Sequence, residues 1–153
     1  MKTWGILIAW VGLMVAASED VGRAAEASEK TSEKGPEKAA EKTATKEAEA
    51  WLALVDQGKQ EDSWDAAAKL FKDAVTREKW KEALTAARSP LGKVITRRLK
   101  SARFATTLPG APDGKYVVLQ FATSFEHKKQ AVETITPMQE ADGAWKVSGY
   151  FIK

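Results

Sequence analysis

Three successive stretches after residue 47 carry apolar residues at the spacing of an amphipathic helix. The first is placed to end at Gly58, the second can be capped by Asp62-Ser63, and the third has Thr76 as N-cap and ends at Ser89-Pro90. The apolar stripes are Ala48, Trp51, Leu52 and Val55; then Trp64, Ala67, Ala68, Phe71 and Val75; then Trp80, Ala83, Leu84 and Ala87. The pattern therefore predicts three helices, each presenting one tryptophan to a core.

After Gly92 the apolar residues follow the period of β-strands. A β-prone segment runs from Val94 to about Thr107, and Arg97-Arg98 breaks its alternation, so we expect a bulge or a strongly curved strand there. Turn residues separate three further predicted strands, at 116–125, about 130–139 and 145–152. In the last strand the residues expected on the core face are Trp145, Val147, Gly149 and Phe151.

Helices followed by strands with short turns predict an α+β fold, because such turns cannot make parallel crossovers. We expect three N-terminal helices packed on a curved four-stranded antiparallel sheet. This folded domain should span residues 47–153.

The first 17 residues have the form of a signal peptide. One positive charge at Lys2 precedes an uncharged apolar run of 14 residues, Trp4 to Ala17. As a helix this run would span about 21 Å, which is short for a bilayer core of about 30 Å. Val15-Ala16-Ala17 offers small residues to a signal peptidase, so we expect cleavage after Ala17. An uncleaved N-terminal anchor is the alternative.

Residues 18–46 are rich in Ala, Glu, Lys, Ser and Thr, and Val21 is their only large aliphatic residue. Acidic and basic residues nearly cancel, and Gly35-Pro36 should interrupt a helix. We expect a flexible or partly helical tether that contributes nothing to the core.

Composition excludes much familiar chemistry. The chain has no cysteine, which excludes thiolate metal sites, cysteine nucleophiles and disulfides. Its one histidine is His127. No phosphate loop, paired-carboxylate motif or metal-ligand spacing is present in the sequence, so no cofactor is expected. A formal net charge of +3 is small for a nucleic-acid-binding protein, and nucleic acid is not an expected partner.

Several motifs of the folded region resemble one family. They are WLALVDQG, SWDAAAKLFK, RSPLG with RRL, LPGAPDGKYVVLQF, ETITPM and DGAWKVSGYFIK. Together they resemble the bacterial exported family called domain of unknown function 4019, over about residues 47–153. That family has no established activity, so the resemblance implies no catalytic residue. The order of elements is also similar, as an analogy of architecture, to the NTF2-like (cystatin-like) cone, in which helices and a bent sheet enclose a pocket.

Six cations within 16 residues form the densest polar cluster of the sequence. They are Arg88, Lys93, Arg97, Arg98, Lys100 and Arg103, with no carboxylate among them. A solvated face with one or two structural ion pairs is one interpretation. An anion-binding surface for lipid headgroups, cell-wall polymers or a partner is the other.

Glu133 is the second candidate site residue, because even spacing from Ala131 and Ile135 places it on the core face of the third strand. An inward carboxylate is costly unless an arginine pairs with it, and Arg97 or Arg98 is the expected partner. Alternatively, Glu133 has a raised pKa and acts as a base in a pocket.

These observations favour an exported, non-enzymatic domain, periplasmic or secreted, that binds a protein partner or a small ligand. It would not be transmembrane after cleavage. The alternatives are an NTF2-like pocket enzyme with Glu133 as base, and a domain that binds anionic envelope polymers through the basic patch at 88–103.

Overall fold

A computed structural model of the chain describes residues 30–153, and side chains from Gly35 onward. The predicted signal peptide lies outside the described residues, as do residues 18–29 of the predicted tether. Four helices precede four strands: α1 (Lys30–Asp56), α2 (Gln60–Asp65), α3 (Lys69–Ala74), α4 (Arg77–Arg88), β1 (Val94–Ala105), β2 (Tyr116–Phe125), β3 (Ala131–Gln139) and β4 (Trp145–Ile152). Within 30–153 no helix combines the length and apolar character needed to cross a membrane.

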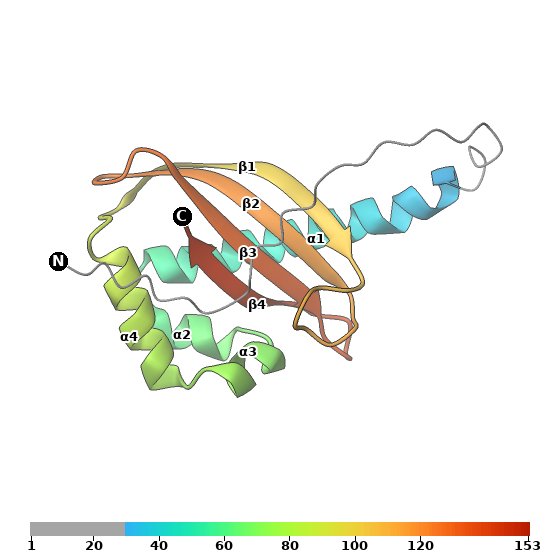
Figure 1. Ribbon diagram of the computed structural model, residues 1–153, viewed down its shortest axis with the longest axis horizontal. Helices are drawn as coiled ribbons and strands as arrows, with labels where there is room; N and C mark the ends of the chain where they lie inside the picture. The colour runs from blue at the N-terminus through green and yellow to red at the C-terminus, as the bar shows by residue number, and fades with distance from the viewer. Residues whose placement is uncertain (1–29) are drawn as a thin grey trace.

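The strands form one antiparallel sheet in the order β1-β2-β3-β4, as the short turns predict. Helix α1 crosses behind this sheet in Figure 1, and the three shorter helices gather on its β4 side. The core lies between α1 and the sheet, where Trp51 and Leu52 meet Leu119, Ile135 and Val147. The α+β class with a four-stranded antiparallel sheet is therefore confirmed.

The prediction of three helices is wrong, because the second predicted helix is two short ones. Between α2 and α3 the chain is extended at Ala68, whose backbone N–H donates to the Val147 carbonyl of β4 at 2.8 Å. A bond to the sheet edge thus replaces an intrahelical bond. Asp62-Ser63 does not cap a helix either: α2 begins at Gln60, and Ser63 is buried inside it. Thr76 does cap α4, accepting from Lys79 N at 3.3 Å.

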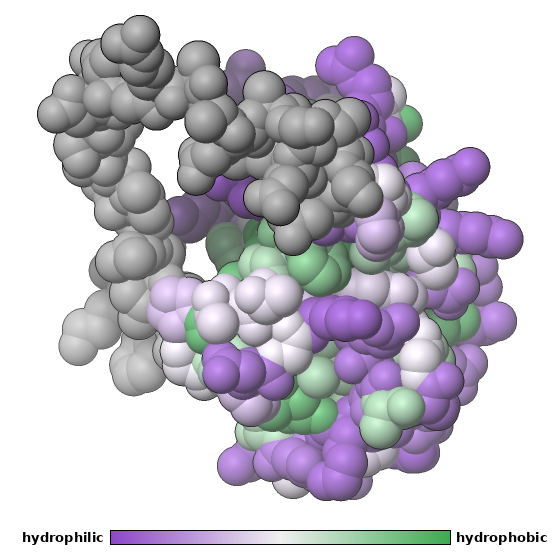
Figure 2. Space-filling view, turned by 90° about the vertical axis from the view of Figure 1, so that its right-hand side faces the viewer, coloured by the Kyte–Doolittle hydropathy of each residue, from purple (hydrophilic) through white to green (hydrophobic). Residues whose placement is uncertain are grey.

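Helix α1 begins well before residue 47, so the expected domain boundary falls in its middle. Pro36 lies inside the helix although the sequence predicts an interruption there. Ala44 is fully buried in the core cluster and Ala40 packs against it, because alanine leaves room for the helix to approach the sheet. The expectation that nothing before residue 47 contributes to the core is therefore wrong. Residues 35–39 are exposed, and this end of α1 extends past the sheet (Figure 1). The surface seen from this side of the molecule carries many hydrophilic side chains (Figure 2).

Bulges decide which side chains of the two edge strands face α1. The pairing of β1 with β2 shifts at Ile95 and at Lys100, so β1 is bulged as expected, but the bulges flank Arg97-Arg98 instead of lying at this pair. The pairing of β3 with β4 shifts between Thr136 and Pro137, so that Ser148 has no partner of its own.

The bulge at Ser148 reverses the predicted face of the end of β4. Trp145 and Val147 are buried as expected, but Phe151 is 36% exposed and Tyr150 is buried in its place. Pro137 has no N–H for the ladder, which is the physical reason for a shift at this point.

Candidate functional site

The site is centred on Glu133, which is fully buried on the inner face of β3. Its strand position places it between Ala131 and Ile135, both buried, as the alternation predicts. In the register of the sheet it lies opposite Phe121 of β2 and Ile152 of β4. The carboxylate therefore sits under α1, away from bulk water.

Arg97 is the main partner of this carboxylate. Its Nε donates to Glu133 Oε1 at 2.8 Å and its Nη2 to Oε2 at 3.2 Å, so the guanidinium holds both oxygens. Arg97 faces inward because it pairs with the buried Thr123 of β2. Arg98 pairs with Ala122 and points to the opposite side of the sheet, so only the first of the two predicted partners reaches Glu133.

Two hydroxyl groups complete the shell around Glu133. Thr123 Oγ1 donates to Oε1 at 2.6 Å, and the Tyr150 hydroxyl donates to Oε2 at 2.6 Å. With the two bonds from Arg97, four donors occupy the acceptor sites of a carboxylate, which number about four.

Arg88, at the end of α4, joins the site from the helical side. Its Nη1 lies 3.5 Å from Glu133 Oε2 and donates to the Tyr150 hydroxyl at 3.2 Å. The guanidinium carbon is 5.0 Å from the centre of the Phe125 ring, a cation–π arrangement.

Asp56, the last residue of α1, closes the network toward solvent. It accepts from Arg97 Nη1 at 2.6 Å and Nη2 at 3.0 Å, and from Arg88 Nη2 at 2.7 Å. Its side chain is 30% exposed, against 15% for Arg97 and 0% for Glu133. Two arginines and two carboxylates thus form a neutral cluster. We call Asp56, Arg88, Arg97, Thr123, Glu133 and Tyr150 the ionic network.

The pKa shifts of Asp56, Arg97 and Tyr150 favour the protonation states that their hydrogen bonds require. Burial raises the pKa of Asp56, but the hydrogen bonds from Arg97 and Arg88 outweigh it and hold that pKa below its ordinary value. Burial lowers the pKa of Arg97, and the bonds to Asp56 and Glu133 more than reverse this. Burial, followed by the charge of Glu133, raises the pKa of the Tyr150 phenol far above its ordinary value. Tyr150 therefore stays a hydrogen-bond donor.

An aromatic cluster supports the network from the side of the helices. Tyr150 packs edge-on against Trp51, with ring centres 5.4 Å apart, and Trp80 lies 5.8 Å from Trp51. Both indoles donate to Ser63, Trp51 to its carbonyl and Trp80 to its hydroxyl. These partners explain why α2 keeps a serine at a buried position.

The six cations of residues 88–103 do not form one patch. Arg88 and Arg97 belong to the ionic network, whereas Lys93, Arg98, Lys100 and Arg103 are exposed. None of these four has an ion pair with a carboxylate among the residues that the structure describes.

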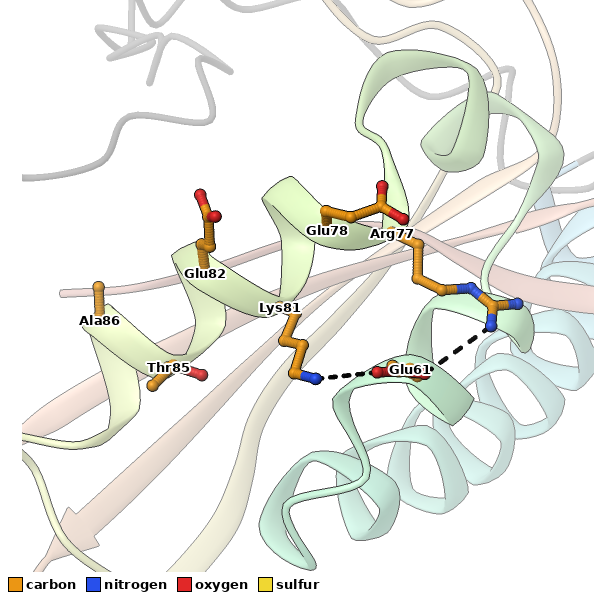
Figure 3. A pocket seen from close by; sticks show the side chains of 7 residues that line it. All are labelled: Glu61, Arg77, Glu78, Lys81, Glu82, Thr85 and Ala86. Atoms are coloured by element: carbon orange, nitrogen blue, oxygen red, sulfur yellow. Dashed lines mark hydrogen bonds and ion pairs between the residues drawn. The ribbon is translucent and has the colours of Figure 1, made fainter.

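A hollow of about 870 Å³ lies elsewhere, between α2 and α4 (Figure 3). Its lining is largely charged: Glu61 accepts from Lys81 at 2.9 Å and pairs with Arg77 at 3.9 Å, while Glu78 and Glu82 also border it. The hollow is open to solvent rather than enclosed, so it would not bury most of the surface of a small organic molecule as a ligand pocket does.

Sequence reasoning missed Asp56, Thr123 and Tyr150, and it assigned Arg88 to a surface. Thr123 carries a signal, because it is the one hydroxyl residue in the inward series of β2. Gly149 beside Tyr150 is another, since glycine within a strand often marks a bulge.

A comparison with protein families matches the part of the chain that contains this site. The family described as "Protein of unknown function (DUF4019)" matches residues 47–150, which include every residue of the ionic network. The chain belongs to this family. A search of the curated proteins found no match.

Proposed function

We propose that this protein is an exported, non-enzymatic domain that binds a partner protein. The observation that carries the non-enzymatic part is the saturation of Glu133. Its two oxygens accept from Arg97, Thr123 and Tyr150. A general base needs a free acceptor within reach of a substrate proton, and these donors occupy that position.

The competing proposal, Glu133 as the base of a pocket enzyme, has a clear structural requirement. Glu133 would have to line an apolar cavity without contacting an arginine. Instead it bonds to Arg97 and lies 3.5 Å from Arg88. Contacts with two guanidinium groups are the surroundings of a structural ion pair.

The proposal includes an NTF2-like arrangement of the elements. A long helix across a bulged antiparallel sheet supports it. In this chain the space around Glu133 is filled by the ionic network and by the rings of Trp51 and Trp80. Binding of a partner protein is therefore better supported than binding of a small ligand between α1 and the sheet.

Binding of an anionic envelope polymer is the second candidate, and the exposed cations Lys93, Arg98, Lys100 and Arg103 favour it. Binding of this kind should weaken steeply between low and physiological ionic strength. Binding to isolated envelope polymer that does not change with salt contradicts this candidate.

Three measurements test the main proposal. N-terminal sequencing of the protein from fractionated cells should give a chain beginning at Ser18 outside the cytoplasm; a chain beginning at Met1 in the cytoplasm contradicts export. Chemical cross-linking in intact cells, followed by purification in denaturant, should yield a defined protein adduct.

Turnover of any substrate in a metabolite panel, lost in Glu133→Gln or Thr123→Val, contradicts the non-enzymatic part. Thr123→Val removes one hydrogen-bond donor to Glu133, and it is the variant to use if Glu133→Gln does not fold.

A further inference from the structure

Charge is unevenly divided between the two faces of the sheet. The four strands together carry five cations, Arg97, Arg98, Lys100, Arg103 and Lys146, and one carboxylate, Glu133. Glu133 faces α1, and Arg97 faces α1 with it. The strands therefore place no carboxylate side chain on the side turned away from α1. We call that side the outer face; it is the side seen in Figure 1.

Three cations of the edge strands belong to this outer face. Arg98 and Arg103 pair with Ala122 and Val118, which alternate along β2 with the buried Phe121 and Leu119. On the opposite edge, Lys146 pairs with Met138 and lies between the inward residues Trp145 and Val147.

Three carboxylates of the adjoining turns are already engaged, and Asp113, in the turn between β1 and β2, has no ion pair among the described residues. Glu126 accepts from the backbone N–H of Lys93 at 2.7 Å, Glu140 from that of Lys69 at 2.7 Å, and Asp142 from that of Ala144 at 2.9 Å. The outer-face cations thus have no ion pair with a carboxylate in the described part of the chain. Their charge is available to a partner.

The middle of the outer face is uncharged. One row across the sheet joins Gln120, Thr134 and Phe151, and Phe151 is 36% exposed. Val118 and Val132 are half-buried on the same face. A centre without charges between charged edges is a common layout of a protein–protein interface, whose core is depleted of charged residues.

The spacing of the cations fits a macromolecule rather than a small anion. The β2 partners of Arg98 and Arg103 are four residues apart, which corresponds to about 13 Å along an extended strand, and β4 lies about 14 Å from β1. No single phosphate or carboxylate can bridge such distances. Four strands of about ten residues cover on the order of 600 Å² on one partner, which corresponds to the low end of specific interfaces.

We propose that the outer face binds a second protein whose contacting surface has an uncharged centre and carboxylates around it. This inference rests on the proposed function and names the surface and the partner chemistry. A second copy of this chain is a poor occupant face to face, because it would oppose cations with cations. A polyanion is also a poor occupant, because the uncharged row from Gln120 to Phe151 offers it no charge.

The test uses photo-cross-linking of the full chain in the cells that produce it. A photoreactive phenylalanine analogue, benzoylphenylalanine, replaces Gln120 at the centre of the outer face. In a matched strain it replaces Thr85, an exposed residue of α4. Each probe is combined with Arg98→Glu/Arg103→Glu and with Lys38→Glu/Lys79→Glu, which changes net charge equally at exposed positions elsewhere. Melting curves verify that the variants are folded.

The expected result is a protein adduct at Gln120 whose cross-linked peptide adjoins acidic residues of the partner. Arg98→Glu/Arg103→Glu should reduce its yield at least tenfold, while the control pair changes it less than twofold. Equal losses in both pairs, or no loss in either, overturn the proposal. So does a Gln120 adduct formed only with this chain itself or only with polysaccharide or lipid. A protein adduct at Thr85 with none at Gln120 overturns this surface and leaves the proposed function intact. The absence of adducts at both positions overturns both proposals.

Discussion

Glu41 and Phe104 are 63 positions apart in sequence, yet the Glu41 carboxylate accepts a hydrogen bond from the Phe104 backbone N–H at 3.1 Å. Phe104 lies near the end of the edge strand β1, where backbone donors have no neighbouring strand. A side chain from the N-terminal half of α1 thus covers an open position of the sheet edge. This contact ties residues before 47 to the fold.

Removal of residues before 47 should therefore destabilise the domain. A chain starting at residue 47 lacks buried Ala44, half-buried Ala40 and the Glu41 bond. We expect its free energy of unfolding to fall by about 2 kcal/mol or more relative to a chain starting at Pro36. Urea denaturation of both fragments measures the difference.

A point substitution separates the hydrogen bond from the packing. Glu41→Ala should cost about 1 kcal/mol, and Glu37→Ala, at an exposed position one turn earlier, should stay within about 0.5 kcal/mol. Equal stability of the two fragments contradicts a structural role for this part of α1.

The ionic network should respond strongly to loss of its buried charge. Glu133→Gln leaves Arg97 and Arg88 facing a neutral group, so we expect a loss of about 3–5 kcal/mol of unfolding free energy. Glu47→Gln, on the exposed side of α1, is the control and should change stability by less than about 0.5 kcal/mol. Denaturant titration distinguishes them. A neutral Glu133→Gln would mean that the ion pair contributes no net stability.

Asp56 should make stability depend on acid pH. Its folded pKa is below the ordinary value, so its contribution is present above the unfolded pKa of about 3.9 and is lost as pH falls through the folded pKa. Asp56→Asn should therefore be less stable than the wild type at pH 7, and the difference should shrink below about pH 4. Chemical denaturation of both proteins from about pH 2.5 to about pH 7 measures this difference in unfolding free energy. A difference that stays constant, or grows toward acid, contradicts the assigned role of Asp56.

Alternation along the chain predicts much of the site and fails at identifiable places. Glu133 could be placed on the inner face because Ala131, Glu133 and Ile135 follow a regular strand. The choice between Arg97 and Arg98 could not be made, because bulges at Ile95 and Lys100 set the phase of β1. Bulges depend on the pairing of two strands, which a pattern along one strand does not contain.

The helices show the same limit. Ala66–Ala68 continue an apolar helical stripe, but the Ala68 N–H bonds to Val147, so tertiary pairing overrides local propensity. Alanines at 40 and 44 give no sequence signal of burial, since alanine is equally common in exposed helices. Asp56 joins the site only because α1 ends beside Arg97 and Arg88.

Because of the bulge at Ser148, substitutions at two adjacent residues of β4 should differ strongly in their cost to stability. Tyr150→Ala removes a buried ring and the donor to Glu133, so it should cost about 3–5 kcal/mol. Phe151→Ala, on the outer face, should cost about 1 kcal/mol or less. Denaturant titration of both variants tests the phase of the strand. A larger cost at Phe151 would restore the uninterrupted alternation and contradict the bulge.

Gly92 and Gly58 have the same backbone conformation in different surroundings. Their φ angles are +74° and +73°, so alanine at either position meets a conformational cost of about 1–2 kcal/mol. At Gly58 an added Cβ meets no atom within 4 Å. At Gly92 it would lie 2.5 Å from Glu126 Oε2, the oxygen that accepts from Lys93 N, and 2.9 Å from Glu126 Cβ.

Displacing Glu126 would leave the Lys93 N–H without its acceptor and loosen the turn in which His127 N donates to the Leu91 carbonyl. We therefore expect Gly92→Ala to cost about 1–3 kcal/mol more than Gly58→Ala, and equal melting temperatures of the two variants would contradict the close approach of these two turns.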